Sequence, residues 1–89
     1  MKLSVEISKY PLTESDYVAA IQDFINRIKD YSGIKVLTNT MSTQLFGDYD
    51  QVMNALSKEL KISFEKYGTS VFACKFIPGD LLEKYGTTN

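Results

Sequence analysis

The stretch IKVLTNTMSTQLFGDYDQV, residues 34–52, decides the fold of this chain. Its first run of strand-forming residues is Ile34–Thr38, and its second run is Thr43–Phe46. The residues between them, 39–42, are polar enough to form a turn. The stretch therefore predicts two consecutive strands that are joined by a short connection.

A helix is expected directly after the second of these strands. Gly47 ends the strand, Asp48 is a candidate cap residue, and Gln51 can reach back in a variant of the capping box. Apolar side chains then recur at three- and four-residue steps as far as Gly68, which terminates the helix. The recurring positions are Val52, Met53, Leu56, Leu60, Phe64 and Tyr67.

The residues before this stretch predict one strand and one helix. Apolar and polar residues alternate over Leu3–Ser8, which is typical of a strand with one buried face, and Pro11 ends that strand. Thr13 or Ser15 can cap a following helix, and Gly33 stops it. The helix is indicated by an apolar series at Tyr17, Val18, Ile21, Phe24, Ile25, Ile28 and Tyr31.

A fourth strand is predicted at Val71–Ile77, broken by Pro78, and residues 86–89 read as a frayed tail. The order β-α-β-β-α-β, in one domain covering residues 1–89, predicts an α+β, ferredoxin-like two-layer sandwich. Its antiparallel sheet has four strands, with strands one and three in the centre. Both helices are expected on one face, which leaves the other face bare.

Composition favours binding over catalysis. The 89 residues include 10 basic and 11 acidic side chains, so no basic excess exists to bind nucleic acid. No histidine is present, which removes the commonest general base and metal ligand, so we expect no enzyme, no metal and no cofactor. The one cysteine, Cys74, fits a reducing cytoplasm and a small buried apolar role. No secretory segment or membrane span is visible, so we expect a soluble, cytoplasmic protein.

Glu6 is the informative residue of the bare face, because it lies in the middle of a central strand. A carboxylate there is harmless if it is solvated or ion-paired, and it is costly if a second subunit covers it unpaired. It can also face a pocket and bind a ligand. The sequence leaves these three interpretations open.

The last two strands cannot be phased from the pattern. Either Met41, Thr43 and Leu45 point inward, or Ser42, Gln44 and Phe46 do. The first choice puts Phe46 beside Glu6, as a floor for a flat heterocycle or simply as packing, which we favour. In strand four, either Phe72, Cys74 and Phe76 or Val71, Ala73 and Lys75 point outward, and an outward Phe set would favour self-association.

Three segments resemble a family of small thiamine-binding-like proteins, the YkoF-like proteins. They are Glu6–Leu12, Met41–Val52 and Phe64–Gly68, and they occur in the family's order and spacing. Lys9, Ser42 and Phe46 depart from the family pattern, which usually has an apolar residue, a glycine and often a glutamate there. The resemblance implies a ferredoxin-like domain in homo-oligomers, as dimers or dimers of dimers.

The resemblance also implies a ligand site. Two-repeat members of the family bind thiamine or its hydroxymethylpyrimidine part, whereas single-domain members are mostly of unproven function. Carried over by position, a pocket on the sheet face would involve Glu6, Ser8, Tyr10, Asn39, Met41 and Thr43. Glu6 could accept from the exocyclic amine and attract the thiazolium cation, and Tyr10 could supply an aromatic face.

Two functions from different classes remain open at this point. The first is a non-catalytic binder of thiamine, its pyrimidine part or a similar heterocycle. The second is an oligomeric regulatory or interaction module whose open sheet face is an assembly surface.

Overall fold

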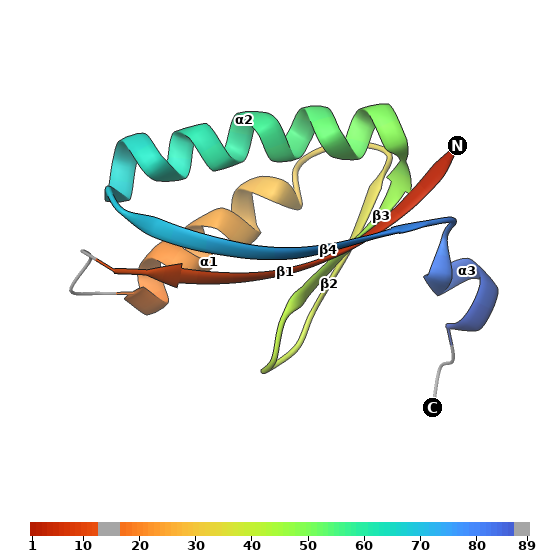
Figure 1. Cartoon of the computed structure of the whole chain (residues 1–89), viewed down its shortest axis with the longest axis horizontal. Helices are drawn as coiled ribbons and strands as arrows, with labels where there is room; N and C mark the ends of the chain where they lie inside the picture. Colours follow the sequence, from red (N-terminus) through yellow and green to blue (C-terminus); the bar gives the residue numbers. More distant parts are fainter. Residues whose placement is uncertain (13–16, 87–89) are drawn as a thin grey trace.

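The computed structural model describes residues 1–12 and 17–86 of the chain. Its elements follow the expected order and add a short helix at the end (Figure 1). They are β1 (Lys2–Pro11), α1 (Tyr17–Ile28), β2 (Ile34–Thr38), β3 (Thr43–Asp48), α2 (Tyr49–Tyr67), β4 (Ser70–Pro78) and α3 (Leu81–Tyr85). The expected caps at Thr13 and Ser15 lie outside the described residues.

The four strands form one antiparallel sheet in the order β2-β3-β1-β4, which confirms the two predicted central strands. Pairing between β1 and β3 runs from Lys2↔Asp48 to Ile7↔Thr43. Pairing between β1 and β4 extends further, as far as Pro11↔Ser70. β1 therefore continues beyond the end of β3 while it is still paired to β4.

The core lies between the sheet and the two long helices. The alternating residues Leu3, Val5 and Ile7 are each at most 4% exposed and pack with Leu45 of β3. Facing them are buried side chains of α1 and α2: Phe24, Ile25, Ile28, Val52, Ala55 and Leu56. The three- and four-residue spacing of these positions places one apolar stripe of each helix against the sheet.

The structure settles the phases that the sequence left open. Thr43 and Leu45 point toward the helices, so Gln44 and Phe46 lie on the open face, opposite Glu6 and Ser4 respectively. In β4, Phe72 and Cys74 pack against the core, so the outward phase of the Phe set is wrong. The open face of β4 instead carries Val71, Ala73, Lys75 and Ile77.

Helix α3 corrects the prediction of a bare second face. Asp80 caps it by accepting a hydrogen bond from the Glu83 N–H at 2.9 Å. Ser4 fastens it to the sheet, because its hydroxyl donates to the Gly79 carbonyl at 2.7 Å and accepts from the Leu81 N–H at 2.9 Å. The helix lies on the side of the sheet opposite α2 (Figure 1), and it covers one end of the open face.

The start of α2 differs from the expected capping box. Asp48 occupies the cap position, but its side chain makes no capping hydrogen bond and instead pairs with Lys2 at 3.3 Å. The other end agrees with the prediction, because Gly68 has a positive φ of 76° and its N–H reaches the Phe64 carbonyl. Within residues 1–12 and 17–86, no helix combines the length and apolar character needed to cross a bilayer.

Candidate functional site

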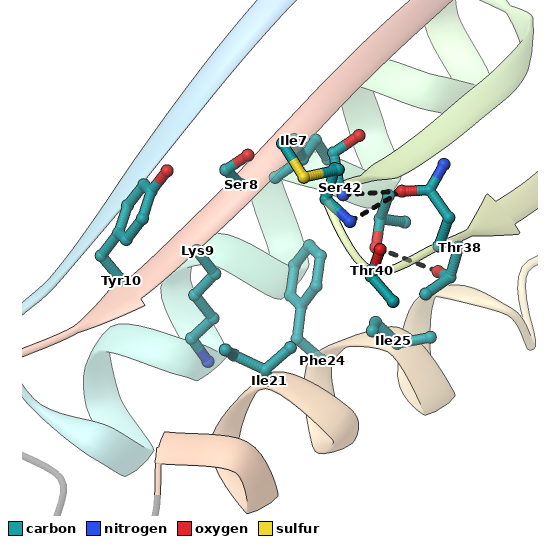
Figure 2. Close-up of a pocket in the computed structure, with 13 residues that line it drawn as sticks. Ile7, Ser8, Lys9, Tyr10, Ile21, Phe24, Ile25, Thr38, Thr40 and Ser42 are labelled. Atoms are coloured by element: carbon teal, nitrogen blue, oxygen red, sulfur yellow. Dashed lines mark hydrogen bonds between the residues drawn. The ribbon is translucent and has the colours of Figure 1, made fainter.

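The first cavity, here called the end pocket, lies where β1 runs past the end of β3. It has a volume of about 160 Å³ and is bounded by β1, by α1 and by the loop that joins β2 to β3. Five of the six residues named from the sequence line it: Ser8, Tyr10, Asn39, Met41 and Thr43. Ile21, Phe24 and Ile25 of α1 form its apolar wall (Figure 2).

The pocket that holds these five residues is at the end of the sheet, whereas the family resemblance implied a pocket on one sheet face. Ser8 and Tyr10 project to one side of β1 and Lys9 projects to the other (Figure 2). Thr43 lies on the helix side of the sheet, and Met41 lies in the loop with 83% of its surface exposed. The predicted residues therefore come from both sides of the sheet, around the edge of β1 beyond the end of β3.

Asn39 fixes the loop that closes the pocket. Its Oδ1 accepts from the Met41 N–H at 2.8 Å and from the Ser42 N–H at 3.1 Å. Its own N–H donates to the Ser42 carbonyl at 3.1 Å. These backbone groups of the loop are therefore hydrogen-bonded within the loop itself. The hydroxyls of Thr38 and Thr43 lie 3.0 Å apart and tie the two strands together at the loop's base.

Glu6 lies outside the end pocket but is hydrogen-bonded to a residue that lines it. Its Oε2 accepts from the hydroxyl of Ser42, a pocket residue, at 2.9 Å, and Gln44 Nε2 donates to the same hydroxyl at 2.9 Å. Its Oε1 is 3.4 Å from Lys75 Nζ. Glu6 is therefore ion-paired in this structure, and it also lines the second cavity, described next.

A second cavity, here called the face pocket, lies between the open sheet face and α3. Its volume is about 420 Å³, and Glu6, Gln44 and Lys75 supply its polar side. Most of its lining is apolar, from Leu37, Phe46, Ile77, Leu81, Leu82 and Tyr85. Phe46 is only 8% exposed there, which agrees with its interpretation as a packing residue.

Lys9 is a functional candidate that the sequence reasoning did not select. Its side chain is buried on the helix side of β1, and its Nζ donates to the Ala20 carbonyl at 3.1 Å and to the Ser63 hydroxyl at 3.4 Å. The ammonium also lies 4.8–5.8 Å from the ring centroids of Phe24, Tyr67 and Phe72. Burial lowers the pKa of Lys9, and nearby Asp23 partly opposes that effect. The alternation Leu3, Val5, Ile7 already placed position 9 on the buried face.

A buried carboxylate joins the two long helices. Glu59 of α2 accepts from Arg27 Nε at 2.6 Å and from the Tyr31 hydroxyl at 2.7 Å, both from the α1 side. The hydrogen bonds to Glu59 raise the pKa of Tyr31 and that of Arg27. Both oxygens of the buried Glu59 carboxylate have partners within the chain, so a structural role fits this cluster.

Cys74 is half-buried against the core, and burial raises the pKa of its thiol. A thiol with a raised pKa is a poor nucleophile at neutral pH, so the apolar role fits its setting. Within the described part of the chain, no group of three or more His, Cys, Asp or Glu could hold a metal ion.

The model of the YkoF-related family matches residues 2–71 of this sequence. The chain belongs to the YkoF-related family. The matched range contains the end pocket in full and stops before α3. No curated protein matches the chain significantly.

Solved structures support the family's fold. A Streptococcus pneumoniae protein is 23% identical, with a TM-score of 0.83 over 98% of this chain and 100% of its own. A hypothetical protein from Methanocaldococcus jannaschii is 26% identical, with a TM-score of 0.76 over 89% of this chain and 81% of its own. A Thermotoga maritima protein suggested to act in thiamine biosynthesis or salvage is 18% identical, with a TM-score of 0.81 over 96% of both chains.

The three departures from the family pattern have different settings in this member. Lys9 is accommodated by backbone oxygen, hydroxyl and aromatic rings, and Phe46 by the face pocket under α3. Ser42 contacts Glu6 and Gln44 through its hydroxyl, which a glycine lacks. The polar link between the end pocket and the open face therefore depends on Ser42.

Proposed function

We propose that this protein is a non-catalytic binder of thiamine, of its hydroxymethylpyrimidine part or of a similar heterocycle, in the end pocket. One observation carries the proposal: five of the six residues implied by the family resemblance gather around a single cavity. Membership of the YkoF-related family and the fold shared with the Thermotoga maritima protein support the thiamine class.

The dimensions and lining of the end pocket suit one small ring. Pockets for drug-sized ligands are about 300–1,000 Å³, and this one is about 160 Å³. An apolar wall from α1 faces hydroxyl and amide groups from the loop, which matches a ring with apolar faces and a polar edge. Of thiamine's two rings, the pyrimidine therefore enters, and the cationic thiazolium stays outside the pocket.

The ionisable residues of the end pocket support binding without catalysis. They are Lys9 and Tyr10, and the Lys9 ammonium is held by Ala20 and Ser63. Tyr10 is 52% exposed at the rim. Among the described residues that line this pocket, Lys9 and Tyr10 do not form a paired nucleophile and base of the kind that acyl or proton transfer requires.

Isothermal titration with thiamine, hydroxymethylpyrimidine and thiamine phosphate tests the proposal. We expect saturable binding with a Kd below about 1 mM for at least one of them. Tyr10→Ala should weaken it, and Tyr85→Ala is the matched control, because Tyr85 is also an exposed tyrosine but lines the face pocket. A flat titration with all three ligands would refute the proposal.

The open face favours a second function, as an assembly surface. Leu37, Val71 and Ile77 are each 40–46% exposed along it, and the 89-residue chain has little core to spare. We propose that a second copy of the chain covers this face. Val71→Lys should lower the mass measured by light scattering, whereas Val18→Lys, at an exposed valine of α1, should leave it unchanged. A wild-type protein that is monomeric at micromolar concentration contradicts this second proposal.

A further inference from the structure

The end pocket contains an unpaired strand edge. β1 pairs with β3 only as far as Ile7↔Thr43, but it pairs with β4 as far as Pro11↔Ser70. Beyond Ile7, one side of β1 therefore faces β4 and the other faces the pocket. The hydrogen bonds that β1 can form with a molecule in the pocket depend on which of its backbone groups point to that side.

The direction of the backbone groups follows from two hydrogen bonds at the N-terminal end of β1. The Met1 carbonyl accepts from the Tyr49 N–H, on the β3 side, whereas the Lys2 carbonyl accepts from the Gly79 N–H, on the β4 side. Because backbone groups alternate along a strand, odd-numbered residues of β1 point toward β3 and even-numbered ones toward β4. The N–H and C=O of Lys9 therefore both point to the end pocket.

The loop opposite does not pair with this edge. The N–H groups of Met41 and Ser42 are taken by Asn39 Oδ1, and the Ser42 carbonyl is taken by the Asn39 N–H. Among the backbone hydrogen bonds formed outside helices and strands by residues 1–12 and 17–86, none involves Lys9. Buried backbone groups are normally paired, so this donor and acceptor require water or a ligand.

We propose that the Lys9 main chain is the recognition edge for a heteroaromatic ring that carries an exocyclic amine beside a ring nitrogen. The ring nitrogen accepts from the Lys9 N–H, and the amine donates to the Lys9 carbonyl. The ring thereby takes the place of the strand residue that would exchange both bonds with Lys9 in a continued β3. The inference rests on the proposed function in taking the end pocket as the ligand site.

A small ring fits this edge better than an extended peptide does. The next odd-numbered residue of β1 is Pro11, which has no N–H to donate. A peptide strand added at this edge could therefore exchange both hydrogen bonds with Lys9, but it would have no N–H to bond at Pro11. Ile21 and Phe24 line the same cavity from α1 (Figure 2), and they suit the apolar face of a ring.

Two matched probes test the edge: 4-amino-2-methylpyrimidine, and 2,4-dimethylpyrimidine, in which a methyl group replaces the amine. We expect the amine to tighten binding at least about tenfold. In amide-resolved NMR, the Lys9 N–H should shift downfield and exchange more slowly at saturation. The Tyr10 N–H, which points to β4, is the internal control. Equal affinities, or an unmoved Lys9 resonance at saturation, would overturn the inference.

Failure of the edge and failure of the proposed function give different results. If thiamine binds while Leu37 and Ile77 shift and Lys9 does not, the edge is wrong and binding occurs in the face pocket. If the aminopyrimidine binds and shifts Lys9 while thiamine and hydroxymethylpyrimidine do not bind, the edge is supported and the thiamine assignment is wrong. If only a capped peptide of alternating threonine and valine shifts Lys9, strand addition replaces ring recognition.

Discussion

At the scale of single residues, Lys9 combines two roles with opposite demands. Its backbone faces the end pocket, while its ammonium is buried between the helices among three aromatic rings. Burial disfavours the charged form, and the rings and two hydrogen bonds offset part of that cost. The side chain can therefore be changed without removing the backbone edge that we propose for recognition.

Lys9→Met tests the cost of the buried charge. We expect the free energy of unfolding at about pH 7 to stay equal or rise by about 1 kcal/mol, since an apolar side chain of similar length replaces a desolvated cation. The folded-state pKa is lowered from 10.5, so the unfolded chain binds more protons between that lowered value and 10.5. Wild-type stability should therefore rise with pH in this window relative to the variant.

Urea unfolding of wild type and Lys9→Met across the alkaline range measures this difference. Lys58→Met, at an exposed lysine of α2, is the matched control for replacing a lysine by methionine. A Lys9→Met protein that is destabilised by more than about 2 kcal/mol would show that the aromatic and hydrogen-bond contacts outweigh desolvation.

Glu59 supports a second residue-scale prediction. Glu59→Gln keeps the side-chain shape but removes the charge that Arg27 and Tyr31 both contact, and we expect a loss of about 1–2 kcal/mol. The loss stays modest because Arg27 is 38% exposed and can turn to water. Spectrophotometric titration should show the raised pKa of Tyr31 falling toward 10.0 in the variant. An unchanged Tyr31 titration would mean that the Glu59 charge does not control it.

At the scale of elements, α3 depends on one side chain of β1. Ser4→Ala removes both hydrogen bonds to residues 79 and 81, which should cost about 1–2 kcal/mol and loosen α3. Faster amide exchange at Leu82–Tyr85 would measure the loosening. Ser8→Ala, on the same strand and the same face, is the control and should leave α3 unchanged. Equal exchange in both variants would show that packing alone holds α3.

The elements also show what the pattern of residues can and cannot predict. β1 and the two long helices were predicted within a few residues because each repeats its period several times, whereas β2, β3 and β4 were predicted from their strand-forming residues. Helix α3 was missed because its five residues, Leu81–Tyr85, are too few to establish a helical period. The phase of β3 stayed open because Leu45 and Phe46 are both apolar, and only α3 explains why the outward one is also buried.

Five of the six predicted site residues line one cavity, but the geometry of that cavity could not be predicted from the sequence. Ser8, Tyr10 and Thr43 could be placed on strands, but the loop residues Asn39 and Met41 could not be oriented by strand alternation. Glu6 was expected among them and lies just outside, because a hydrogen bond to Ser42 and an ion pair with Lys75 hold it on the open face. The unpaired backbone of Lys9 could not be predicted from the sequence, because it depends on the strand register, which sets where β3 ends relative to β1.

At the scale of the whole molecule, the two cavities lie at different places on the sheet. The long helices cover one face, α3 covers one end of the other, and the end pocket opens where β1 outruns β3. A chain of 89 residues buries only about 60–65% of its unfolded surface, so its global stability is small. The binding free energy of a ligand that fills the gap between β1, α1 and the loop is therefore large compared with the free energy of unfolding of the chain.

This reasoning predicts a large thermal shift on binding. A ligand at a hundred times its Kd adds about 2.7 kcal/mol, and each kcal/mol moves Tm by about 4–8 °C in a domain of this size. Saturating ligand in the end pocket should therefore raise Tm by about 10–20 °C, with a logarithmic dependence on its concentration. Tyr10→Ala should move the curve to higher concentrations by weakening Kd, whereas Tyr85→Ala should leave it in place. A ligand that titrates calorimetrically but leaves Tm unchanged at saturation would have to bind the unfolded chain equally well, and the end pocket would then not be its site.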